Sequence, residues 1–464
     1  MAALEALWRA QRAACLAHGA STGQQRREAL ARLAQAVRDD QELLVAAVAQ
    51  DFGCRPAEET RLLELLPLLD AIRHARRHLR RWMRPRRVAT NWQFLPGKAR
   101  VLYQPLGVVG IIGAWNYPIL LTLSPLVDAL AAGNRVMLKP SELAPATAAA
   151  LAALIARTFP PEQVTVVQGD AEVAAAFSAL PFDHLLFTGS SRVARQVLHA
   201  AADRLTPVTL ELGGKSPALV HASFALDQAA DRICTAKFWN AGQTCVAPDH
   251  VWVPTALLPL FAECAVAAIR RRWPQGVDQA DYTHLINDAA ATRQRELLDD
   301  ALAHGARALW PVGEWGDGRA LPPVLLLGCT TGMRVMQEEI FGPILPLCGY
   351  DELDQALTQL AAPPHPLALY YFDRDRTRVK AVLARTRSGG VTVNDCLFHL
   401  AQHDLPFGGV GASGMGAYHG EAGFRRFSHA RAVLWQSEAT ARLFSLFKPP
   451  YRRLGRRLVD WLLR

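Results

Sequence analysis

The stretch VLYQPLGVVGIIGAWNYPILLTLSPLVDALAAGNRVMLKP, residues 101–140, decides the class of fold. Residues 101–113 and 134–140 are short apolar runs typical of buried strands. Residues 119–133 between them have the length and composition of a helix, and Gly133 is a typical helix stop. A strand, a helix and a second strand at this spacing predict two parallel strands joined by a crossover helix.

The same alternation continues toward the C-terminus. The predicted helices span 144–158, 171–179 and 191–204, and the strands that follow them are VTVVQG, HLLFTG and PVTLELGG. This pattern predicts a parallel sheet covered by helices on both faces. Ligands of such sheets bind at the carboxyl ends of the strands. Asn116, Lys139, Gly189 and Glu211 each end or follow a strand, so we expect them along one rim.

The regions on either side have their own patterns. Residues 1–85 carry apolar side chains at helical spacing and are predicted to be helical. A second α/β region begins after Gly214. Its predicted helices span 225–239 and 286–304, and its predicted strands lie near 250–254, 323–327, 344–348 and 367–372. The Gly-rich segment 398–420 is predicted to be a loop.

Composition limits the class of protein further. The 464 residues are 50% hydrophobic and 20% charged, as in ordinary globular chains of two or three domains. The eight cysteines form no C-x-x-C pair, which fits a reducing compartment. There is no secretory signal and no apolar stretch of about 20 residues, so we expect a cytoplasmic protein.

Positive charge is concentrated in two segments. The formal net charge is +9, and residues 448–464 alone hold six basic residues and one acidic residue. Eight arginines between Arg73 and Arg87 are interpreted as a solvated helix face. Neither segment is accompanied by aromatic stacking platforms or a known reader module, so nucleic-acid binding is not predicted.

Two side chains are candidates for catalysis, one as a nucleophile and one as a general base. Cys245, in FWNAGQTCVAP, follows the end of a predicted helix, where a thiol is accessible. The alternative for a lone cysteine is a small buried hydrophobic residue. Glu211, in VTLELGGKSP, follows an apolar strand, and burial would raise its pKa toward that of a general base. A helix cap or an ion pair with Lys215 is the alternative for Glu211.

Phosphate and metal motifs are weak. FTGSSRVARQVL is a strand end, a turn and a helix start, where backbone amides can bind phosphate, but it has no G-x-G-x-x-G. The GGKS at 213–216 is no P-loop, because Thr209 stands where the first glycine belongs. His399 and His403 could share a helix face, but without a third ligand we predict no metal site.

Seven short motifs then point to one family. GAWNYP, LKPSE, FTGS, LELGGKSP, GQTC, EEIFGP and PFGGVGASGMGAYHG occur between residues 113 and 420 in the order seen in the aldehyde dehydrogenase superfamily. The last motif and QTCVAPD resemble the class 3 branch. LPFDHLLFTGS and HLAQHDLPFGG are most similar to the bacterial coniferyl-aldehyde dehydrogenases.

The resemblance implies a role for each matching residue. Cys245 resembles the nucleophile, Asn116 the side chain that holds the oxyanion, and Glu211 the base that activates water. The residues implied to contact the cofactor are Trp115, Lys139, Ser141, Glu142, Thr188, Gly189, Ser190, Val193, Leu212, Glu339 and Phe341. The cofactor implied is NAD, with NADP as an alternative. Ala194 replaces the last glycine of the family's phosphate turn, and Arg192 beside it could contact phosphate.

The resemblance also implies an architecture. We expect an α/β fold with a Rossmann-like cofactor domain, a second α/β catalytic domain and a small bridging arm. The expected divisions are 1–82 with 102–210, 211–395, 83–101 with 396–440, and a tail at 441–464. A homodimer is implied as well.

The implied reaction is the NAD(P)-dependent oxidation of an aldehyde to a carboxylic acid through a cysteine thiohemiacetal and thioester. The substrate is an aromatic, coniferyl-type aldehyde or a medium- to long-chain aliphatic one. Trp115, Tyr117, Phe238 and Phe398 are candidates for the walls of its pocket. A cysteine hydrolase or acyltransferase without hydride transfer is the alternative function.

The C-terminal segment forms a basic amphipathic pattern. After Pro449 and Pro450, apolar residues recur at helical spacing and arginines occupy the other face. Such a helix either docks its apolar stripe on its own protein or lies on an anionic membrane. The second alternative would place the protein at the inner face of a membrane.

Overall fold

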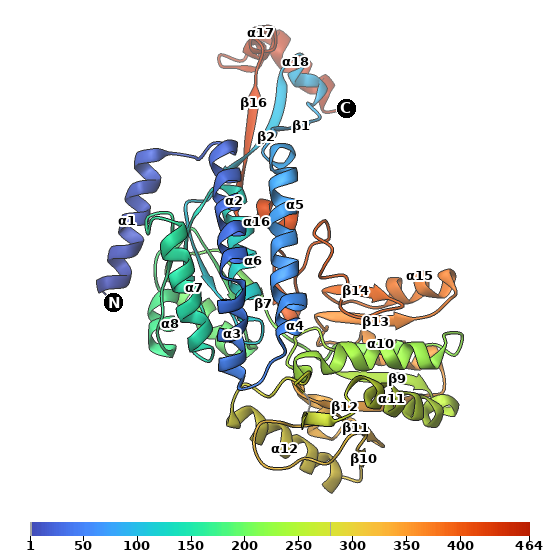
Figure 1. Ribbon diagram of the computed structural model, residues 1–464. Coiled ribbons are helices and arrows are strands. Elements are labelled where there is room, and N and C mark those ends of the chain that lie inside the picture. Colours follow the sequence, from blue (N-terminus) through green and yellow to red (C-terminus); the bar gives the residue numbers. More distant parts are fainter. Residues whose placement is uncertain (1, 279) are drawn as a thin grey trace.

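The chain folds around two parallel sheets and a projecting arm (Figure 1). The computed structural model describes residues 2–278 and 280–464. The α/β class predicted from the sequence is confirmed, and the strands of the two large sheets follow one another along the chain in the expected alternation with helices.

The first sheet has six strands in the order β15-β7-β6-β3-β4-β5. They are β3 (Val108–Ile112), β4 (Arg135–Lys139), β5 (Val164–Val166), β6 (His184–Thr188), β7 (Val208–Glu211) and the antiparallel β15 (Gly414–Met415). The helices between them are α6 (Pro118–Ala132), α7 (Pro145–Thr158), α8 (Ala171–Ser178) and α9 (Ser191–Ala202).

Side chains that alternate along β3 divide the core into two layers. Val109 and Ile111 pack with one group of helices, whereas Val108 and Ile112 pack with α1, α8 and α9 on the other face. The N-terminal helices are α1 (Ala2–His18), α2 (Gly23–Asp39), α3 (Gln41–Phe52), α4 (Ala57–Thr60) and α5 (Leu66–Trp82), with a π-helical turn at Arg61–Leu65. The prediction that residues 1–85 are helical is therefore confirmed.

The predicted strand 101–113 is wrong, because it is two strands. The chain breaks at Gly107, whose φ is +140°, and a Cβ there would lie 2.2 Å from the Asp183 carboxylate. β2 (Lys98–Pro105) belongs to the arm, and β3 begins the six-stranded sheet. Apolar residues on both sides of the break concealed it in the sequence.

The second sheet has seven strands in the order β10-β11-β12-β9-β8-β13-β14, all parallel except β10. They are β8 (Pro217–Val220), β9 (His250–Pro254), β10 (Arg307–Leu309), β11 (Val324–Leu327), β12 (Ile344–Tyr350), β13 (Ala368–Phe372) and β14 (Gly390–Val393). Its helices are α10 (Leu226–Phe238), α11 (Leu258–Arg272), α12 (Asp288–Ala303), α13 (Arg334–Gln337), α14 (Leu353–Ala361) and α15 (Arg376–Arg385).

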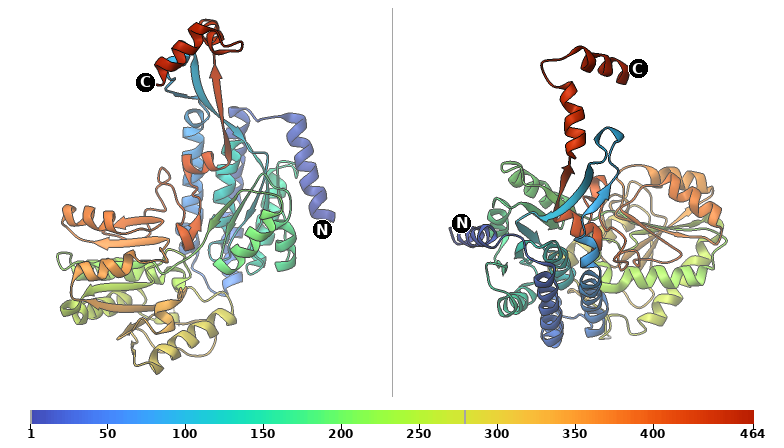
Figure 2. Two further views of the ribbon diagram at one scale, coloured as in Figure 1. Left: turned by 180° about the vertical axis from the view of Figure 1, so that it is seen from behind. Right: turned by 90° about the horizontal axis from the view of Figure 1, so that it is seen from above.

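The arm is a three-stranded antiparallel sheet that carries the C-terminal helices away from the body (Figure 2). It contains β1 (Arg86–Val88), β2 and β16 (Ser428–Trp435), followed by α17 (Glu438–Phe444) and α18 (Arg453–Leu462). The short helix α16 (Gly420–Arg426) packs against α5 and α6 at its base. The apolar stripe of α18 is not covered by its own chain, because Leu454 and Trp461 are exposed, and the choice between docking and membrane contact stays a prediction.

The predicted loop 398–420 also supports the end of strand β7. It is largely irregular, but β15 within it pairs with β7, so that Gly414 lies opposite Glu211. The Glu211 backbone is therefore held on both sides, by β6 and by this loop. The division of the chain into domains stays a prediction.

Candidate active site

A cavity of about 720 Å³ opens at the carboxyl ends of β3, β4, β6 and β7. Segments of the second sheet close its other side. Of the residues implied by the family resemblance, those in its wall are Trp115, Asn116, Ser141, Glu142, Thr188, Gly189, Ser190, Val193, Glu211, Leu212, Cys245, Glu339 and Phe341. The structure thus brings together residues that are more than 200 positions apart in the chain.

Lys139 lies behind the cavity wall rather than in it. Its side chain is buried at the end of β4, where Nζ donates to the Pro140 carbonyl at 2.9 Å and lies 3.6 Å from a Glu142 carboxylate oxygen. Burial lowers the pKa of Lys139. The Glu142 carboxylate lines the cavity and is partly exposed, so it adds negative charge at this end of the site.

The start of α9 faces the same cavity. Ser190 caps the helix, and its Oγ accepts a hydrogen bond from the Val193 amide at 3.4 Å. Backbone amides in a first helical turn lack helical partners and can bind phosphate oxygens. Ala194, which replaces a glycine of the family turn, is buried in the hydrophobic cluster with Phe177 and Leu210. Its methyl group therefore packs in the core.

A turn in left-handed conformation presents Cys245. Asn240 and Ala241 have φ values of +54° and +50°, and Gly242 follows with φ +78°. A Cβ on Gly242 would lie 2.2 Å from the Gly342 carbonyl oxygen, so only glycine fits there. Non-glycine residues are strained in this region of backbone space and persist only where the surroundings hold them. The thiol of Cys245 is partly exposed, in the cavity wall.

The surroundings of Cys245 oppose its ionisation. Burial, together with the nearby carboxylates of Glu339 and Glu211, raises the pKa of its thiol to about 12. The sequence predicted an accessible thiol with thiolate character. The access is present, but the protein alone keeps the sulfur protonated, so ionisation needs positive charge or a base brought to the cavity.

Glu211 ends β7 with both carboxyl oxygens buried and without hydrogen-bond partners. Burial raises its pKa well above the ordinary value, and the charge of Arg426 opposes the shift. The alternative of an ion pair with Lys215 is wrong, because Lys215 instead pairs with Asp249 and donates to the Val335 carbonyl at 2.7 Å. An uncommitted buried carboxyl beside a thiol is suited to proton transfer.

Glu339 and Phe341 close the cavity from the side of the second sheet. The Glu339 carboxylate lies against Gly213, where a Cβ would approach to 2.2 Å. Burial raises the pKa of Glu339 to about 7, opposed by a hydrogen bond from the Gly214 amide. Phe341 has φ +54° and meets the Trp115 ring edge to face, with ring centroids 5.5 Å apart.

A buried network, which the sequence did not reveal, positions Asn116. The Asn116 side-chain amide donates to the Gln243 carbonyl at 3.0 Å, which leaves its second N–H free. The Asn116 carbonyl accepts from Arg55 at 2.9 Å and from the Asn240 side chain at 2.9 Å. Arg55 also lies 3.4 Å from Glu64, and both side chains are fully buried.

The same network reaches the residue before the cysteine. The Arg55 guanidinium lies 4.8 Å from the centre of the Tyr117 ring. The Tyr117 hydroxyl is 2.7 Å from Thr244 Oγ1, directly before Cys245 in the chain. Arg55 therefore supports both the Asn116 side chain and the backbone that presents the thiol. A buried arginine between two helices has no local sequence signature.

Other expected site residues lie elsewhere. Trp115 lines the cavity, but Tyr117 is buried in the network, and Phe238 packs in the core against Trp273. Phe398 is exposed. His399 and His403 lie in turns rather than on one helix face. Within residues 2–278 and 280–464, no three His, Cys, Asp or Glu side chains are grouped to hold a metal ion.

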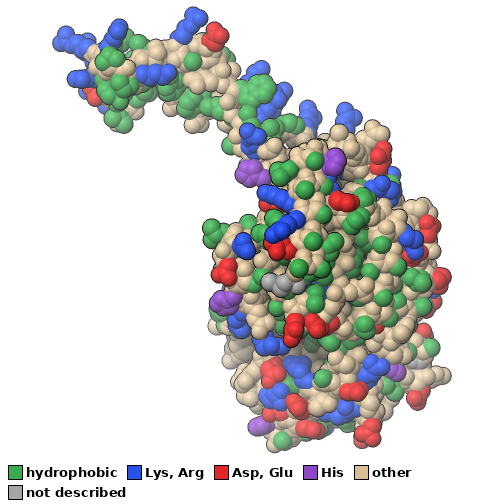
Figure 3. Space-filling view, turned by 90° about the vertical axis from the view of Figure 1, so that its left-hand side faces the viewer, with side chains coloured by type: hydrophobic (Ala, Val, Ile, Leu, Met, Phe, Trp, Pro, Cys, Tyr) green, Lys and Arg blue, Asp and Glu red, His purple; other side chains and the backbone are tan. Residues whose placement is uncertain are grey.

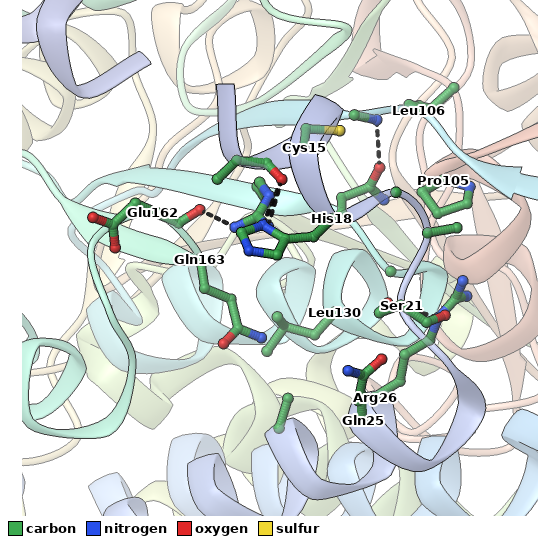
Figure 4. Close-up of a pocket in the computed structure, with 18 of the residues that line it drawn as sticks. Cys15, His18, Ser21, Gln25, Arg26, Pro105, Leu106, Leu130, Glu162 and Gln163 are labelled. Carbon is green, nitrogen blue, oxygen red and sulfur yellow. Dashed lines mark hydrogen bonds between the residues drawn. The ribbon is translucent and has the colours of Figure 1, made fainter. Parts of the chain in front are cut away.

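A larger cavity, of about 1070 Å³, lies at the opposite end of the six-stranded sheet (Figure 4). Helices α1 and α6 end there, and their last carbonyls accept hydrogen bonds from arginines. Arg26 donates to Ala131 at 3.1 Å, and Arg135 donates to Ala14 at 3.0 Å. Cations at helix C-termini stabilise the helices. These arginines thus have a structural role.

The comparisons with known proteins agree with this geometry. The model of the aldehyde dehydrogenase family matches residues 2–433, and the chain belongs to that family. It is 49% identical over 456 residues to the "Probable coniferyl aldehyde dehydrogenase" of Pseudomonas aeruginosa, covering 98% of this chain and 95% of that one. It is 46% identical over 417 residues to the "Coniferyl aldehyde dehydrogenase" of Pseudomonas sp. strain HR199, covering 88% and 86%.

A solved structure extends the agreement to the fold. The substrate-bound state of Staphylococcus aureus AldH superposes with a TM-score of 0.93 at 35% identity, covering 99% of both chains. The protein is therefore an aldehyde dehydrogenase, and members of its family bind NAD or NADP. This result sets aside the cysteine hydrolase or acyltransferase as the main activity. No helix in the described part of the chain is both long and apolar enough to cross a membrane.

Proposed function

We propose that this aldehyde dehydrogenase oxidises coniferyl-type aromatic aldehydes with NAD, using Cys245 as nucleophile and Glu211 as base. The observation that carries the proposal is one cavity in which the Cys245 thiol and the Glu211 carboxyl lie close enough for the carboxylate to raise the thiol pKa, with the Asn116 amide in the same wall. The names of the two Pseudomonas relatives support the substrate class.

The cavity fits a dinucleotide. The first turn of α9 offers amides to the pyrophosphate, and Trp115, Glu339 and Phe341 border the end near Cys245, where a nicotinamide would lie. A bound nicotinamide supplies a hydride acceptor and a positive charge. That charge favours the thiolate of Cys245, which the protein alone disfavours.

The residues of the chain then act in a fixed order. The Cys245 thiolate attacks the aldehyde carbon, and the free N–H of the Asn116 side chain stabilises the oxyanion of the thiohemiacetal. Transfer of the thiohemiacetal hydride to a bound nicotinamide would leave a thioester on Cys245. Glu211, once deprotonated, removes a proton from water, which attacks the thioester and releases the acid.

The Glu142 carboxylate favours NAD over NADP. It lines the adenosine end of the cavity, and a second negative group on the ribose would be repelled there. The chain is also proposed to form a homodimer. Its eight free cysteines support a reducing compartment.

Absorbance at 340 nm tests the proposal. A panel of coniferyl, cinnamyl, benzaldehyde-type and C6–C16 aliphatic aldehydes is assayed with each cofactor. We expect the highest kcat/KM for coniferyl aldehyde with NAD, and a gain in NADP use by Glu142→Gln. A preference for long aliphatic aldehydes would contradict the substrate class, whereas absence of reduction with every aldehyde would contradict the activity.

A further inference from the structure

Acidic side chains are ordinarily exposed, and Figure 3 shows them spread over one face of the body. Glu59, on the short helix α4, is an exception with an exposed fraction of 8%. The Asn240 backbone amide donates to one of its carboxyl oxygens, and the Thr283 hydroxyl donates to the other. Both partners lie in the second α/β region, 181 and 224 positions away along the chain. The catalytic roles proposed above do not use this buried carboxyl.

The hydrogen bond from Asn240 holds the first residue of the left-handed turn, residues 240–242. Asn240 and Ala241 have φ values of +54° and +50°, a strained region of backbone space for residues other than glycine. The Asn240 amide follows the end of α10, and the Glu59 carboxyl accepts its hydrogen bond in place of a helix carbonyl. A strained turn persists only where its surroundings hold it, so Glu59 is one of the groups that maintain this turn.

The left-handed turn also orients the side chain of Asn116. The Asn240 side-chain amide donates to the Asn116 carbonyl at 2.9 Å and to the Gln243 carbonyl at 3.1 Å. The Gln243 carbonyl accepts a further hydrogen bond from the Asn116 side chain at 3.0 Å. The Gln243 side chain donates back to the Asn240 carbonyl at 3.0 Å. A shift of Asn240 would therefore move both the Asn116 amide and the backbone that leads to Cys245.

We propose that Glu59 is a positioning residue for aldehyde oxidation, which holds the left-handed turn so that the Cys245 thiol and the Asn116 amide keep their mutual geometry. The inference rests on the proposed roles of Cys245 and Asn116. Glu59 does not line the cavity, so it acts through the turn and not by contact with substrate or cofactor. A misplacement of reacting groups by about 1 Å can cost about 10²-fold in rate.

Its partners distinguish Glu59 from Glu64, the other buried carboxyl near Arg55. The Arg55 guanidinium lies 3.4 Å from Glu64, which also accepts from two backbone amides at the start of α6, at 2.8 and 3.1 Å. Burial raises the pKa of Glu59, and the charge of Arg55 opposes the shift. Both oxygens of Glu59 are nevertheless bonded to the second α/β region. Glu64 thus supports the side of the site that carries Asn116, and Glu59 supports the side that carries the nucleophile.

The chemistry of the two hydrogen bonds to Glu59 selects the test variants. A backbone amide can only donate, so position 59 must present an acceptor to Asn240. A hydroxyl can donate or accept, so Thr283 fits a carboxylate, a protonated carboxyl or an amide. Glu59→Gln therefore retains both contacts, whereas Glu59→Met fills the space without an oxygen acceptor.

Steady-state kinetics with NAD and the rate of Cys245 alkylation by iodoacetamide test the proposal. At equal folded fraction, Glu59→Met should lower kcat about 10²-fold with an unchanged KM for NAD. Glu59→Gln should stay within about threefold of the unsubstituted protein. In the protein without NAD, Glu59→Met should raise alkylation of the Cys245 peptide about fivefold, because a released turn removes the thiol from the burial and the carboxylates that raise its pKa. Lowered stability alone does not combine slower oxidation with faster alkylation in the folded protein.

Two further variants complete the experiment. Asp373 is also buried and accepts from a backbone amide and a hydroxyl, but it follows β13 at the carboxyl ends of the second sheet, whereas Cys245 precedes β9. At equal folded fraction, Asp373→Leu should change neither kcat nor alkylation. Thr283→Val removes one of the two hydrogen bonds to Glu59 and is the milder variant if Glu59→Met folds poorly. It should lower kcat about fivefold.

Two results would overturn the proposal. One is a Glu59→Met variant with the kcat and the alkylation rate of the unsubstituted protein. The other is a Glu59→Gln variant as impaired as Glu59→Met, because the acceptor for Asn240 would then not be what matters. Failure of the proposed function is a separate outcome, in which no aldehyde reduces NAD with the unsubstituted protein. The alkylation rate of Cys245 needs no turnover and still decides whether Glu59 holds the turn.

Discussion

The six-stranded sheet has a cavity at each end, and the two cavities differ in whether their buried ionisable side chains have hydrogen-bond partners. At the amino ends of the strands, Arg26 and Arg135 are paired with helix carbonyls. At the carboxyl ends, both oxygens of the buried Glu211 lack hydrogen-bond partners. The cavity at the amino ends is the larger, at about 1070 Å³ against about 720 Å³. A buried carboxyl without hydrogen-bond partners, and not the volume of the cavity, distinguishes the reactive end.

Substitution of a cysteine at each end gives the largest expected contrast. Cys245→Ser should lower aldehyde oxidation by about 10⁴-fold or more, because a serine hydroxyl is a far weaker nucleophile in the same place. Cys15→Ser, in the wall of the cavity at the amino ends, should leave kcat unchanged. Steady-state kinetics with NAD measures both. Residual oxidation within tenfold of the unsubstituted rate in Cys245→Ser would mean that another group forms the covalent intermediate.

Glutamates give the next contrast. Glu211→Gln should lower kcat by about 10²–10⁴-fold while NAD binding persists, because the amide cannot take a proton from water. Since burial raises the pKa of Glu211, the rate of the unsubstituted enzyme should rise with pH as this carboxyl deprotonates, and the variant should lose that rise. Glu162→Gln, an exposed change at the amino-end cavity, is the control. Full turnover in Glu211→Gln would remove it from the role of base.

Two buried arginines, one near each cavity, test whether the effect of a substitution on kcat depends on the position of the arginine or only on its burial. Arg55→Met should lower kcat by about 10²-fold, because Asn116 loses a partner that holds its backbone. It should also cost about 3–5 kcal/mol of stability, since Glu64 is left buried without its ion pair. The KM for NAD should stay constant, because Arg55 does not line the cavity.

The matched variant for this contrast is Arg26→Met. Arg26 is also buried, and its loss should cost about 2–3 kcal/mol through the unpaired Ala131 carbonyl. Its kcat, corrected for the folded fraction, should not change. Arg55→Lys retains charge for Glu64 and should recover part of the stability but less of the rate. If Arg55→Met kept the full kcat once folded, the network would be structural only.

The sequence predicted where the strands of the active site end, but not the long-range contacts that support and tune its residues. The strand ends at Asn116, Gly189 and Glu211 follow from the alternation of strands and helices, because carboxyl ends of parallel strands meet at one edge. The role of Arg55 did not follow, because it depends on a contact 61 positions away along the chain. Nor did the high pKa of Cys245, which two distant carboxylates and burial create together.

Prediction of the fold from the sequence was limited in the same way, by contacts between distant parts of the chain. Periodicity located the strands and helices around residues 108–211, yet it joined β2 to β3 across Gly107, because residues on both sides of the break are apolar. The break depends on the Asp183 carboxylate, which occupies the space of a Cβ at Gly107. Local pattern determines which segments are strands, whereas long-range packing determines the sheet to which each strand belongs.

Substitution of Glu339 gives the smallest expected effect, and this effect is on the stability of the protein rather than on its rate. Burial raises its pKa from 4.5 to about 7 in the folded protein, so the folded state binds this proton more tightly than the unfolded state does. Stability from this group is full below pH 4.5 and is lost as the pH rises to about 7, by about 3 kcal/mol. Relative to the unsubstituted protein, Glu339→Gln should therefore become more stable by that amount between pH 5 and pH 8. Urea unfolding of the cofactor-free protein at four pH values measures the difference.

A control and an opposite outcome complete this test. Glu162→Gln removes an exposed carboxyl at the amino-end cavity and should show no such dependence on pH. A constant difference between Glu339→Gln and the unsubstituted protein would mean that the Glu339 carboxylate is already satisfied. The carboxyl-end cavity would then lack one of its two costly charges, and the contrast between the two ends of the sheet would depend on Glu211 alone.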